Sequence, residues 1–570
     1  MPVFSRRSFL GLGAAAIGGA LGTSMLLPEI KGISNKFLGL HLPFSGEVMG
    51  EDFKAAHAMR DGTLTPMTAP DNDKILDVVI VGGGPSGLST AMALNMSGND
   101  NFMILEKEDV PGGLCRGNVR KDGLFYACGA HYVDYPTPQA TYLHQIYQAC
   151  GVMDGLHPDG WPRMAAESLL SGHEHNIYSQ GQWYPEQFPY QAASEQDLIA
   201  SDAFGRDTWM WTNWRDSQGR PAFCYPISWT SDDPEVRRLD GISMSEYLKR
   251  KGFNSPALEW YVNNRTLDEY GCSIHDTSAW AGLMYFSASR TGFKSMIPDS
   301  ERVPRLVTWP GGLGHLTSRM AATLPADRLI TGALVLRVKD EGDSVVVSWY
   351  DIHTKRHHCV RARQAVLGIP KNQLPHLIPE YREKGHFSYA PADYTSWIIS
   401  VIHLKKVPSF GKGSLAWENL LHDSWTLGYV NNQHMEKGRS PDKPHILSMY
   451  AALAGNTMRE RMELLTYGWD YWARLTVWEL MKAHPDIIDY IEKLDIWKWG
   501  HPMLQPKVGH VWGADRAGLL KPFGRIRMGH ADVCGIPVFE EVTYRGFQIA
   551  EEILAELGTP IPTRLTPGKV

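Results

Sequence analysis

Three glycines near the start of the chain have the spacing of a phosphate-binding turn. Gly82, Gly84 and Gly87 form the pattern G-x-G-x-x-G, with Pro85 and Ser86 inside it. In such a turn the first glycine allows a tight bend, the second lets a pyrophosphate approach the backbone, and the third lets a helix pack closely on a strand. Unpaired N–H groups at the helix start then bind the phosphates. The spacing therefore predicts a dinucleotide-binding site.

The neighbouring residues predict the elements that such a site requires. Residues 75–81 (ILDVVIV) form a continuous apolar run, as buried parallel strands do, and a helix is expected at 88–94. A second strand is expected at 102–105 and ends at Glu106, which lies 19 residues beyond Gly87. An acidic residue at that distance accepts a hydrogen bond from a ribose hydroxyl and disfavours a 2′-phosphate.

A second pair of glycines follows the expected ribose-binding acid. Gly112 and Gly113 are followed by Leu114 and, two residues later, by Arg116. This run resembles the second glycine motif of the flavin amine oxidase and carotenoid desaturase superfamily, in which an arginine commonly comes directly after the glycines. Leu114 holds that place here, so a phosphate-binding role for Arg116 stays open. The resemblance implies that the dinucleotide is FAD and that these residues and Lys107 lie beside it.

Two later stretches match the superfamily in the same order. Gly129, Ala130 and His131 resemble the start of the strand that passes beneath the flavin ring. Residues 309–316 lead into an expected helix, which is followed by strands expected at 328–330, 334–338 and 344–348. In the superfamily a valine backbone in this strand pair holds the adenine, and Val335 fits that place.

The C-terminal part gives the strongest match. Residues 524–532 resemble the closing motif of the superfamily, a strand that ends in a glycine and acid cluster before a helix. The resemblance implies that Asp532 accepts a hydrogen bond from the ribityl chain, whereas a capping carboxylate is the alternative. Phe539, Glu541 and Val542 would lie at the helix start, whose positive end points at the flavin pyrimidine or the pyrophosphate.

The separation of these blocks predicts the architecture. The fold class is α/β (α+β overall), with a Rossmann-type FAD-binding domain of three chain segments and a mixed substrate-binding domain built from two inserts. Ligands bind where such domains meet. The expected parts are a signal peptide at 1–27, an N-terminal extension at 28–73, the FAD-binding domain at 74–135, 301–375 and 511–558, the substrate-binding domain at 136–300 and 376–510, and a tail at 559–570.

The first insert is dense in aromatic residues. A wall of aromatic rings suits a cationic amine through cation–π attraction, although any single tryptophan is more commonly a core residue. Residues 360–370 and 50–62 resemble bacterial spermidine dehydrogenases within the superfamily. That likeness implies oxidation of the C–N bond of an amine or polyamine, with a hydride equivalent passed to the flavin and an imine left for hydrolysis. The tryptophans are Trp161, Trp183, Trp209, Trp211, Trp214, Trp229, Trp260 and Trp280.

Candidate catalytic residues follow from the same resemblance. His131, His315 and His530 are the polar side chains expected nearest to the flavin, with a structural hydrogen-bonding role as the alternative for each. Many amine oxidases place a lysine beside flavin N5, and its counterpart here is Ile399. This difference disfavours rapid reaction with oxygen and favours a quinone or a cytochrome as electron acceptor. No cysteine lies between 360 and 533, so FAD is expected to bind non-covalently.

The N-terminus has the features of an export signal. Residues 5–10 (SRRSFL) contain a twin arginine, and an apolar run rich in Gly and Ala follows. The pattern predicts a periplasmic or secreted protein that crosses the twin-arginine translocase already folded around FAD. Membrane association through an uncleaved signal is the alternative.

Composition disfavours several other classes. The formal net charge of −6 gives no basic footprint, so nucleic acid is not an expected partner. Seven cysteines show no metal-ligand spacing, and no metal site is expected. The expected partners are a small amine and an electron acceptor. A flavin-dependent desaturase or isomerase of a hydrophobic polyene, and a flavin-fold binding protein without turnover, are the alternatives.

Overall fold

The computed structural model describes residues 35–170, 174–288, 306–383, 394–410 and 414–565. The chain divides into two compact units, Met1–His41 and Leu42–Val570. In the first unit the described residues include one short 3-10 helix, η1 (Asn35–Gly39). The expected signal peptide at 1–27 lies outside the described residues. All further elements belong to the second unit.

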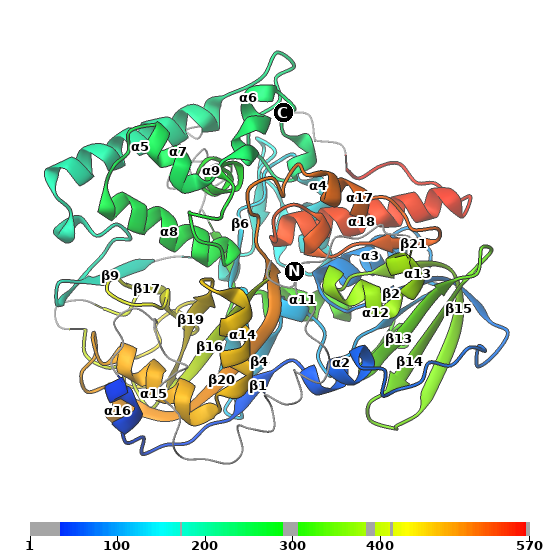
Figure 1. Ribbon diagram of the computed structural model, residues 1–570, viewed down its shortest axis with the longest axis horizontal. Helices are drawn as coiled ribbons and strands as arrows, with labels where there is room; N and C mark the ends of the chain where they lie inside the picture. Colours follow the sequence, from blue (N-terminus) through cyan, green and yellow to red (C-terminus); the bar gives the residue numbers. More distant parts are fainter. Residues whose placement is uncertain (1–34, 171–173, 289–305, 384–393, 411–413, 566–570) are drawn as a thin grey trace, which may run out of the picture. The chain divides into compact units, whose positions relative to one another are not determined.

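A seven-stranded sheet carries the dinucleotide motifs (Figure 1). Apolar runs from three distant parts of the chain supply its strands, in the order β12 (Leu329–Ile330), β3 (Phe102–Leu105), β2 (Ile75–Val81), β15 (His357–Leu367), β14 (Val345–Asp351) and β13 (Ala333–Asp340), and β21 (Ile526–Met528) also pairs with β15. The pairs β12–β3, β3–β2, β2–β15 and β15–β21 are parallel, whereas β15–β14 and β14–β13 are antiparallel. Val78, Val79 and Ile80 are fully buried, as a strand covered on both faces requires.

Two helices pack against each other beside this sheet because glycines let them approach. They are α3 (Pro85–Asn95) and α18 (Phe539–Glu556). A Cβ added to Gly546 would lie 2.1 Å from Ser89 Oγ, and one added to Gly87 would lie 1.9 Å from the Gly82 carbonyl oxygen. Both distances are far inside van der Waals contact. α11 (Leu313–Ala322) packs on α3, and α4 (Thr141–Ala149) packs on α18.

An eight-stranded sheet forms the other half of the unit. Its order is β1 (Val48–Gly50), β20 (Ile491–Leu504), β16 (Tyr394–Leu404), β19 (His445–Leu453), β18 (Gly428–Asn431), β17 (Glu418–Leu421), β9 (His175–Ser179) and β10 (Gln182–Tyr184). Ile399 stands opposite Tyr450 and Trp497 on neighbouring strands, so these three side chains share one face. The other face meets α15 (Trp469–Leu480), where Ser400 Oγ and Thr476 Oγ1 lie 2.7 Å apart.

The first insert adds a group of helices, seen together in Figure 1. Serines at the starts of four of them cap the free N–H groups, and Gly271 ends α8 in the left-handed region at φ +59°. Trp211 and Trp280 are buried in the core that these helices share. The helices are α5 (Glu195–Asn213), α6 (Pro234–Arg237), α7 (Met244–Arg250), α8 (Pro256–Tyr270) and α9 (Ala279–Ser287).

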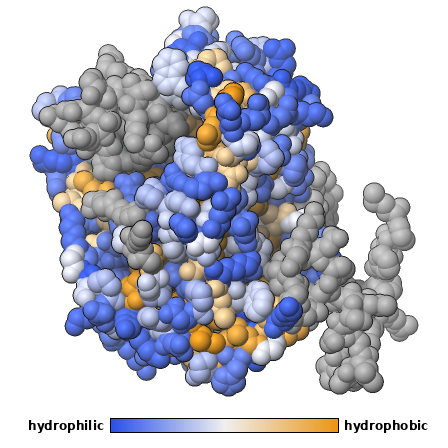
Figure 2. All heavy atoms as spheres, turned by 90° about the vertical axis from the view of Figure 1, so that its left-hand side faces the viewer, coloured by the Kyte–Doolittle hydropathy of each residue, from blue (hydrophilic) through white to orange (hydrophobic). Residues whose placement is uncertain are grey.

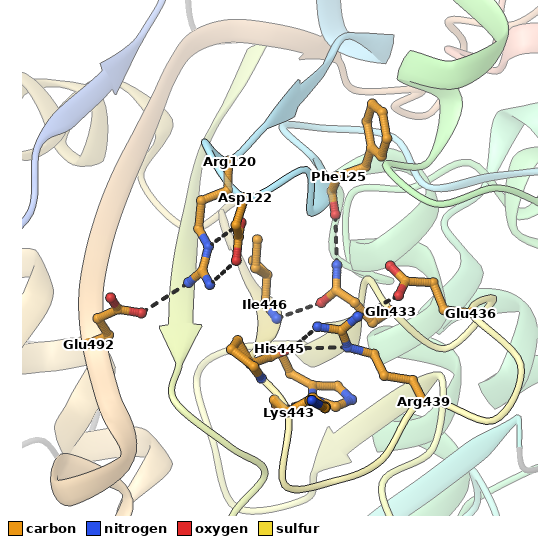
Figure 3. A network of polar contacts seen from close by, with 11 residues as sticks. Arg120, Asp122, Phe125, Gln433, Glu436, Arg439, Lys443, His445, Ile446 and Glu492 are labelled. Carbon is orange, nitrogen blue, oxygen red and sulfur yellow. Dashed lines mark hydrogen bonds and ion pairs between the residues drawn. The ribbon is translucent and has the colours of Figure 1, made fainter.

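A short hairpin, β4 (Gly117–Val119) and β5 (Phe125–Ala127), links the two halves. Gln433 fastens it, because its Nε2 donates to the Phe125 carbonyl at 2.9 Å and its Oε1 accepts from Ile446 N–H at 2.6 Å (Figure 3). At the turn of the hairpin, Arg120 pairs with Asp122 and with Glu492 of β20. The hairpin therefore holds the segments on either side of it against the eight-stranded sheet.

The remaining elements are short. They are α2 (Phe53–Arg60), α12 (Leu374–Leu377), α13 (Pro379–Glu383), α14 (Thr457–Thr466), α16 (Ile487–Tyr490), α17 (Ala514–Leu519), β6 (Tyr132–Asp134), β7 (Met153–Leu156), β8 (Pro162–Met164) and β11 (Leu306–Thr308). Within the described ranges, no helix combines the length and the apolar composition needed to cross a bilayer. The prediction of a mixed α/β fold with a Rossmann-type sheet is confirmed, while the domain boundaries stay predictions.

The contact at Gly87 gives a test of how the dinucleotide half is held together. We expect Gly87→Ala to lower the free energy of unfolding by about 2 kcal/mol or more, because its Cβ would overlap the Gly82 carbonyl. Gly205→Ala is the matched control, since Gly205 is also helical but has open space around its Cβ position. There we expect no loss, or a gain of up to about 1 kcal/mol. Urea unfolding without added ligand measures both, and equal stabilities would contradict this account.

Candidate functional site

A cavity collects residues from both halves of the unit. Its lining runs from the glycine turn, past the β4–β5 hairpin, to the face of the eight-stranded sheet. Most residues expected from the sequence to bind the cofactor lie along it: Gly82, Gly84, Pro85, Ser86, Glu106, Lys107, Gly113, Leu114, Arg116, Gly129, Ala130, His131, Val335, Phe539 and Val542. The cavity therefore brings together stretches that are hundreds of residues apart.

The turn after β2 has the geometry of a phosphate cradle. Gly82 has φ +98°, a conformation that favours glycine, and Gly84 caps α3 with Pro85 in its first turn. The helix start opens on the cavity, so its free N–H groups face the interior. Ser86 Oγ is buried and has no hydrogen-bond partner among the described residues.

The second glycine pair packs against this turn. Gly112 N–H donates to the Gly83 carbonyl at 2.8 Å, and a Cβ on Gly113 would lie 3.4 Å from Gly84 Cα. Gly113 lines the cavity, whereas Gly112 lies behind the lining and supports it. The backbone of Gly112 has φ +121°, a conformation that favours glycine. Gly87 is also behind the lining, where it serves the packing of α3 on the turn.

Glu106 is fixed at the end of β3 by two backbone donors. Its Oε2 accepts from Gly83 N–H at 2.6 Å and its Oε1 from Glu108 N–H at 2.8 Å. Burial raises the pKa of this carboxyl, and the two hydrogen bonds oppose the rise. The carboxyl lines the cavity beside Lys107, whose ammonium pairs with Glu108. An acceptor held in this way suits a ribose hydroxyl.

Arg116 is a buried cation at the same end of the cavity. Its guanidinium carbon lies 5.1 Å from the ring centres of both Trp497 and Trp499. Its Nη1 is 3.4 Å from Glu108 Oε2, and its Nε has no hydrogen-bond partner in the described part of the chain. An unpaired buried donor is costly, so this position favours an anionic ligand.

His131 lies where the lining passes from the glycine turn to the sheet. It is 7% exposed, its ring meets Tyr450 edge-on with ring centres 4.9 Å apart, and Thr308 Oγ1 donates to its carbonyl at 2.6 Å. Burial lowers the pKa of His131 to about 3, so the imidazole is neutral at physiological pH. Its Nε2 has no hydrogen-bond partner among the residues described.

The other two histidines differ from each other. His530 lines the cavity, and its Nδ1 lies 3.1 Å from Asp532 Oδ1. His315 is not among the described lining residues, so its expected place near the ring stays a prediction that the cavity does not support. Leu313 faces the cavity from the start of α11, and two residues further along a helix the side chain has turned away, here to stack on Trp309 at 5.9 Å.

Two acids of the closing motif also lie behind the lining. Asp532 Oδ2 accepts from Lys371 N–H at 2.7 Å and from the Tyr394 hydroxyl, rather than facing the cavity. Burial acts to raise the pKa of Asp532, but His530 and Tyr394 hold it below the usual value. Glu541 Oε1 accepts from Ile227 N–H at 2.6 Å. These carboxyls therefore have supporting contacts within the chain, and the hydrogen bond from the ribityl chain to Asp532 stays a prediction.

The far end of the cavity combines aromatic and acidic side chains that sequence analysis did not single out. Trp397 and Tyr450 line it from the sheet and Trp417 from the position before β17, whereas none of the eight tryptophans of the first insert lines it. Asp134, Asp268, Glu269, Glu418 and Glu540 contribute carboxyls. They come from a strand, a helix, another strand and a second helix, so nothing in their spacing along the chain could have marked them.

The acids at this end are held by named partners. Glu269 Oε2 accepts from the Tyr132 hydroxyl at 3.1 Å. Glu418 lies 3.3 Å from Arg265 Nη1, and although burial acts to raise its pKa, this arginine lowers it overall. Ile399 lines the same end, and Lys107 is the one lysine among the described lining residues. The assignment of Ile399 as the counterpart of the lysine beside flavin N5 stays a prediction.

Comparisons with known proteins place the fold. A family model described as an NAD(P)-binding Rossmann-like domain matches residues 80–150. A stretch of 91 residues, 16% of this chain, is 36% identical to 15-cis-phytoene desaturase of Narcissus pseudonarcissus, of which it spans 15%. Putrescine oxidase bound to putrescine superposes with a TM-score of 0.60 at 16% identity, covering 85% of this chain and 99% of that one.

A second solved structure gives the same result. Cyclohexylamine oxidase from Brevibacterium oxydans superposes with a TM-score of 0.57 at 16% identity, covering 85% of this chain and all of that one. The similarity therefore extends over both sheets and is not confined to the Rossmann-like part. The chain has the fold of these amine oxidases.

The pKa of Glu541 offers a stability test of the closing motif. Burial raises it to about 8, while an unfolded glutamate loses its proton near 4.5, so the free energy of unfolding should fall as pH rises from 4.5 to 8. Glu541→Gln keeps an oxygen for Ile227 N–H and cannot ionise. We expect its stability relative to wild type to rise across that window, by at most about 1.4 kcal/mol per pH unit. Chemical unfolding at several pH values measures this, and parallel curves would contradict it.

Proposed function

We propose that this protein is an FAD-dependent oxidoreductase of the flavin amine oxidase superfamily that oxidises a C–N bond of an amine or polyamine. The observation that carries the proposal is the continuity of the cavity. A cradle suited to a dinucleotide leads directly into an end lined by aromatic rings and carboxyls. The first part supplies a place for FAD and the second a place for a cation.

The donors along the cradle fit FAD. Ser86 Oγ, Arg116 Nε and His131 Nε2 are all buried without partners among the described residues, and all three residues line the cavity. When bound there, FAD would supply the acceptor for the two electrons removed from the substrate. The start of α3 and Arg116 would bind the diphosphate, and Glu106 would bind the ribose. Val335 would lie against the adenine.

The chain would prepare the amine in two ways. Carboxyls such as Glu269 attract an ammonium group, and the rings of Trp417 and Tyr450 replace the water around it. His131 is neutral, so it adds no positive charge that would repel the substrate. The aromatic side chains that line this end would limit the access of water to the reacting carbon. A hydrophobic polyene would make no use of these carboxyls, whereas a cationic amine would pair with them, and this argues against a desaturase or isomerase.

A polyamine is the substrate that makes most use of several carboxyls, and we propose a spermidine dehydrogenase-like specificity. We expect anaerobic addition of diamines and polyamines to bleach the flavin absorbance, while carotenoids leave it unchanged. Glu269→Gln should raise the concentration of spermidine needed for half-maximal bleaching about tenfold, with a smaller effect for a monoamine. Glu259→Gln, an exposed change on the same helix, is the control.

Either of two results would remove this specificity. One is equal bleaching by Glu269→Gln and wild-type protein over the same spermidine range. The other is a flavin that no amine in the panel reduces, which would leave the polyene chemistry or a binding role to be tested. Aromatic amines and amino acids complete the panel, because the carboxyl-lined end should discriminate against amino acids by repulsion of their carboxylate.

Ile399 motivates a proposal about the electron acceptor. Its position at the cavity, in place of the lysine that many amine oxidases carry, favours a quinone or a cytochrome over oxygen. We therefore expect the amine-reduced protein to be reoxidised slowly by air and rapidly by a soluble quinone in stopped-flow absorbance. Stoichiometric hydrogen peroxide formed as fast as the quinone reacts would contradict it. The export signal makes the periplasm or the outside of the cell the proposed location, with passage through the twin-arginine translocase and, if the signal is retained, attachment to the membrane.

A further inference from the structure

Residues 45–60, called the strap below, cross from the eight-stranded sheet to the dinucleotide end of the cavity. They precede the glycine turn by more than 20 residues and belong to none of the three segments expected to bind FAD. The strap consists of β1, a turn and α2. Glu51 and Ala56 line the cavity together with Glu108 and Val335.

The first end of the strap is fastened along β20. β1 pairs in parallel with this strand, with Val48 opposite Ile496 and Gly50 opposite Lys498. Before β1, Glu47 N–H donates to Asp495 Oδ1 at 2.9 Å. The two chains lie so close that a Cβ on Gly50 would be 2.4 Å from the Lys498 carbonyl oxygen, at φ +134°. Only glycine fits this place without displacing the strap.

The middle of the strap contacts the cofactor end directly. Arg116 Nη2 donates to the Gly50 carbonyl at 3.0 Å, and Asp52 N–H donates to Glu108 Oε1 at 3.0 Å. Lys107 Nζ donates to the Asp52 carbonyl at 3.2 Å. Three charged residues beside the expected ribose and phosphates are therefore positioned by strap backbone groups.

The second end of the strap is held by α2. The Asp52 side chain accepts from Ala55 N–H at 3.0 Å and so caps this helix. Met59 is buried in the core of the seven-stranded sheet, where α2 packs against β13. The strap is thus anchored on both halves and passes over the cavity between its anchors.

From these contacts we propose that the strap is a fourth cofactor-binding segment, which closes the dinucleotide end of the site and limits the release of bound FAD. The inference rests on the proposed function only in taking FAD as the ligand. Arg116 contacts the strap through the Gly50 carbonyl and contacts β20 through the rings of Trp497 and Trp499. If the strap opens, Arg116 therefore loses its hydrogen bond to Gly50. FAD would leave when this group of contacts opens, and its retention should depend on how firmly the strap is held.

Release of FAD in the absence of any amine tests the strap. Holoprotein is diluted in the dark, and the rise in fluorescence of free FAD gives the rate. We expect Gly50→Ala to release FAD about tenfold faster than wild type, because its Cβ forces the strap away from β20. Asp52→Ala, which removes the cap of α2, should release it a few-fold faster. Gly342→Ala is the matched control, since Gly342 also has a positive φ (+92°) but open space around it.

The outcomes separate clearly. Faster release in Gly50→Ala and Asp52→Ala, with the control at the wild-type rate, supports the strap. Release at the wild-type rate in both strap variants would overturn it, and so would equal acceleration in the control. If Gly50→Ala does not fold, the comparison of Asp52→Ala with Gly342→Ala decides. Because no amine is present, a negative result here leaves the proposed oxidation untouched, and a failure of amine-driven bleaching leaves the strap untouched.

Discussion

The site depends on places where chain segments pack so closely that glycine is needed. Gly87 packs α3 onto the Gly82 carbonyl, Gly113 packs the second glycine pair onto Gly84, and Gly546 packs α18 onto α3 at Ser89. A Cβ at Gly87 or Gly546 would overlap its neighbour, whereas one at Gly113 would just touch Gly84 Cα at 3.4 Å. Together they bring three distant segments into one cradle whose wall is backbone, with N–H groups facing inward. The same principle recurs at Gly50, where the strap meets β20.

The second constraint is the cost of buried polar groups. Ser86 Oγ, Arg116 Nε and His131 Nε2 lack partners among the described residues, although most buried polar groups in proteins are paired. A ligand with phosphate, ribityl and ring acceptors would satisfy them. Towards the sheet the wall changes character, because aromatic rings and carboxyls replace backbone donors. The cavity is thereby divided into an anion-binding part and a cation-binding part, and an amine would meet the cofactor where the two join.

Local patterns allowed much of this fold to be predicted from the sequence. Runs such as 75–81 and 102–105 are strands as expected, and the glycine spacing located the turn, although α3 begins at Pro85, before the helix expected at 88–94. The expected strands near 334–338 and 344–348 and the helix after the closing motif are also present. These predictions succeed because strand and helix periodicity and turn chemistry act over a few residues.

Side chains whose surroundings depend on tertiary packing could not be placed from the sequence. His315 was expected near the ring, but helix rotation turns it towards Trp309. Glu541 is directed to Ile227, a contact with a residue over 300 positions away. The acids at the far end, among them Asp268 and Glu418, meet only because a helix of one insert packs near a strand of the other. The pairing of β1 with β20 is also a long-range contact, and no local pattern in residues 45–60 predicted it.

Quantifying the nucleotide that accompanies the purified chain tests the central claim most directly. The visible absorption spectrum is recorded, the protein is precipitated with acid, and the supernatant is analysed by chromatography. We expect flavin absorption bands and one FAD per chain, released into the supernatant by acid. A colourless protein that also fails to take up added FAD would contradict it, because the cradle described here would then have no ligand of the expected kind.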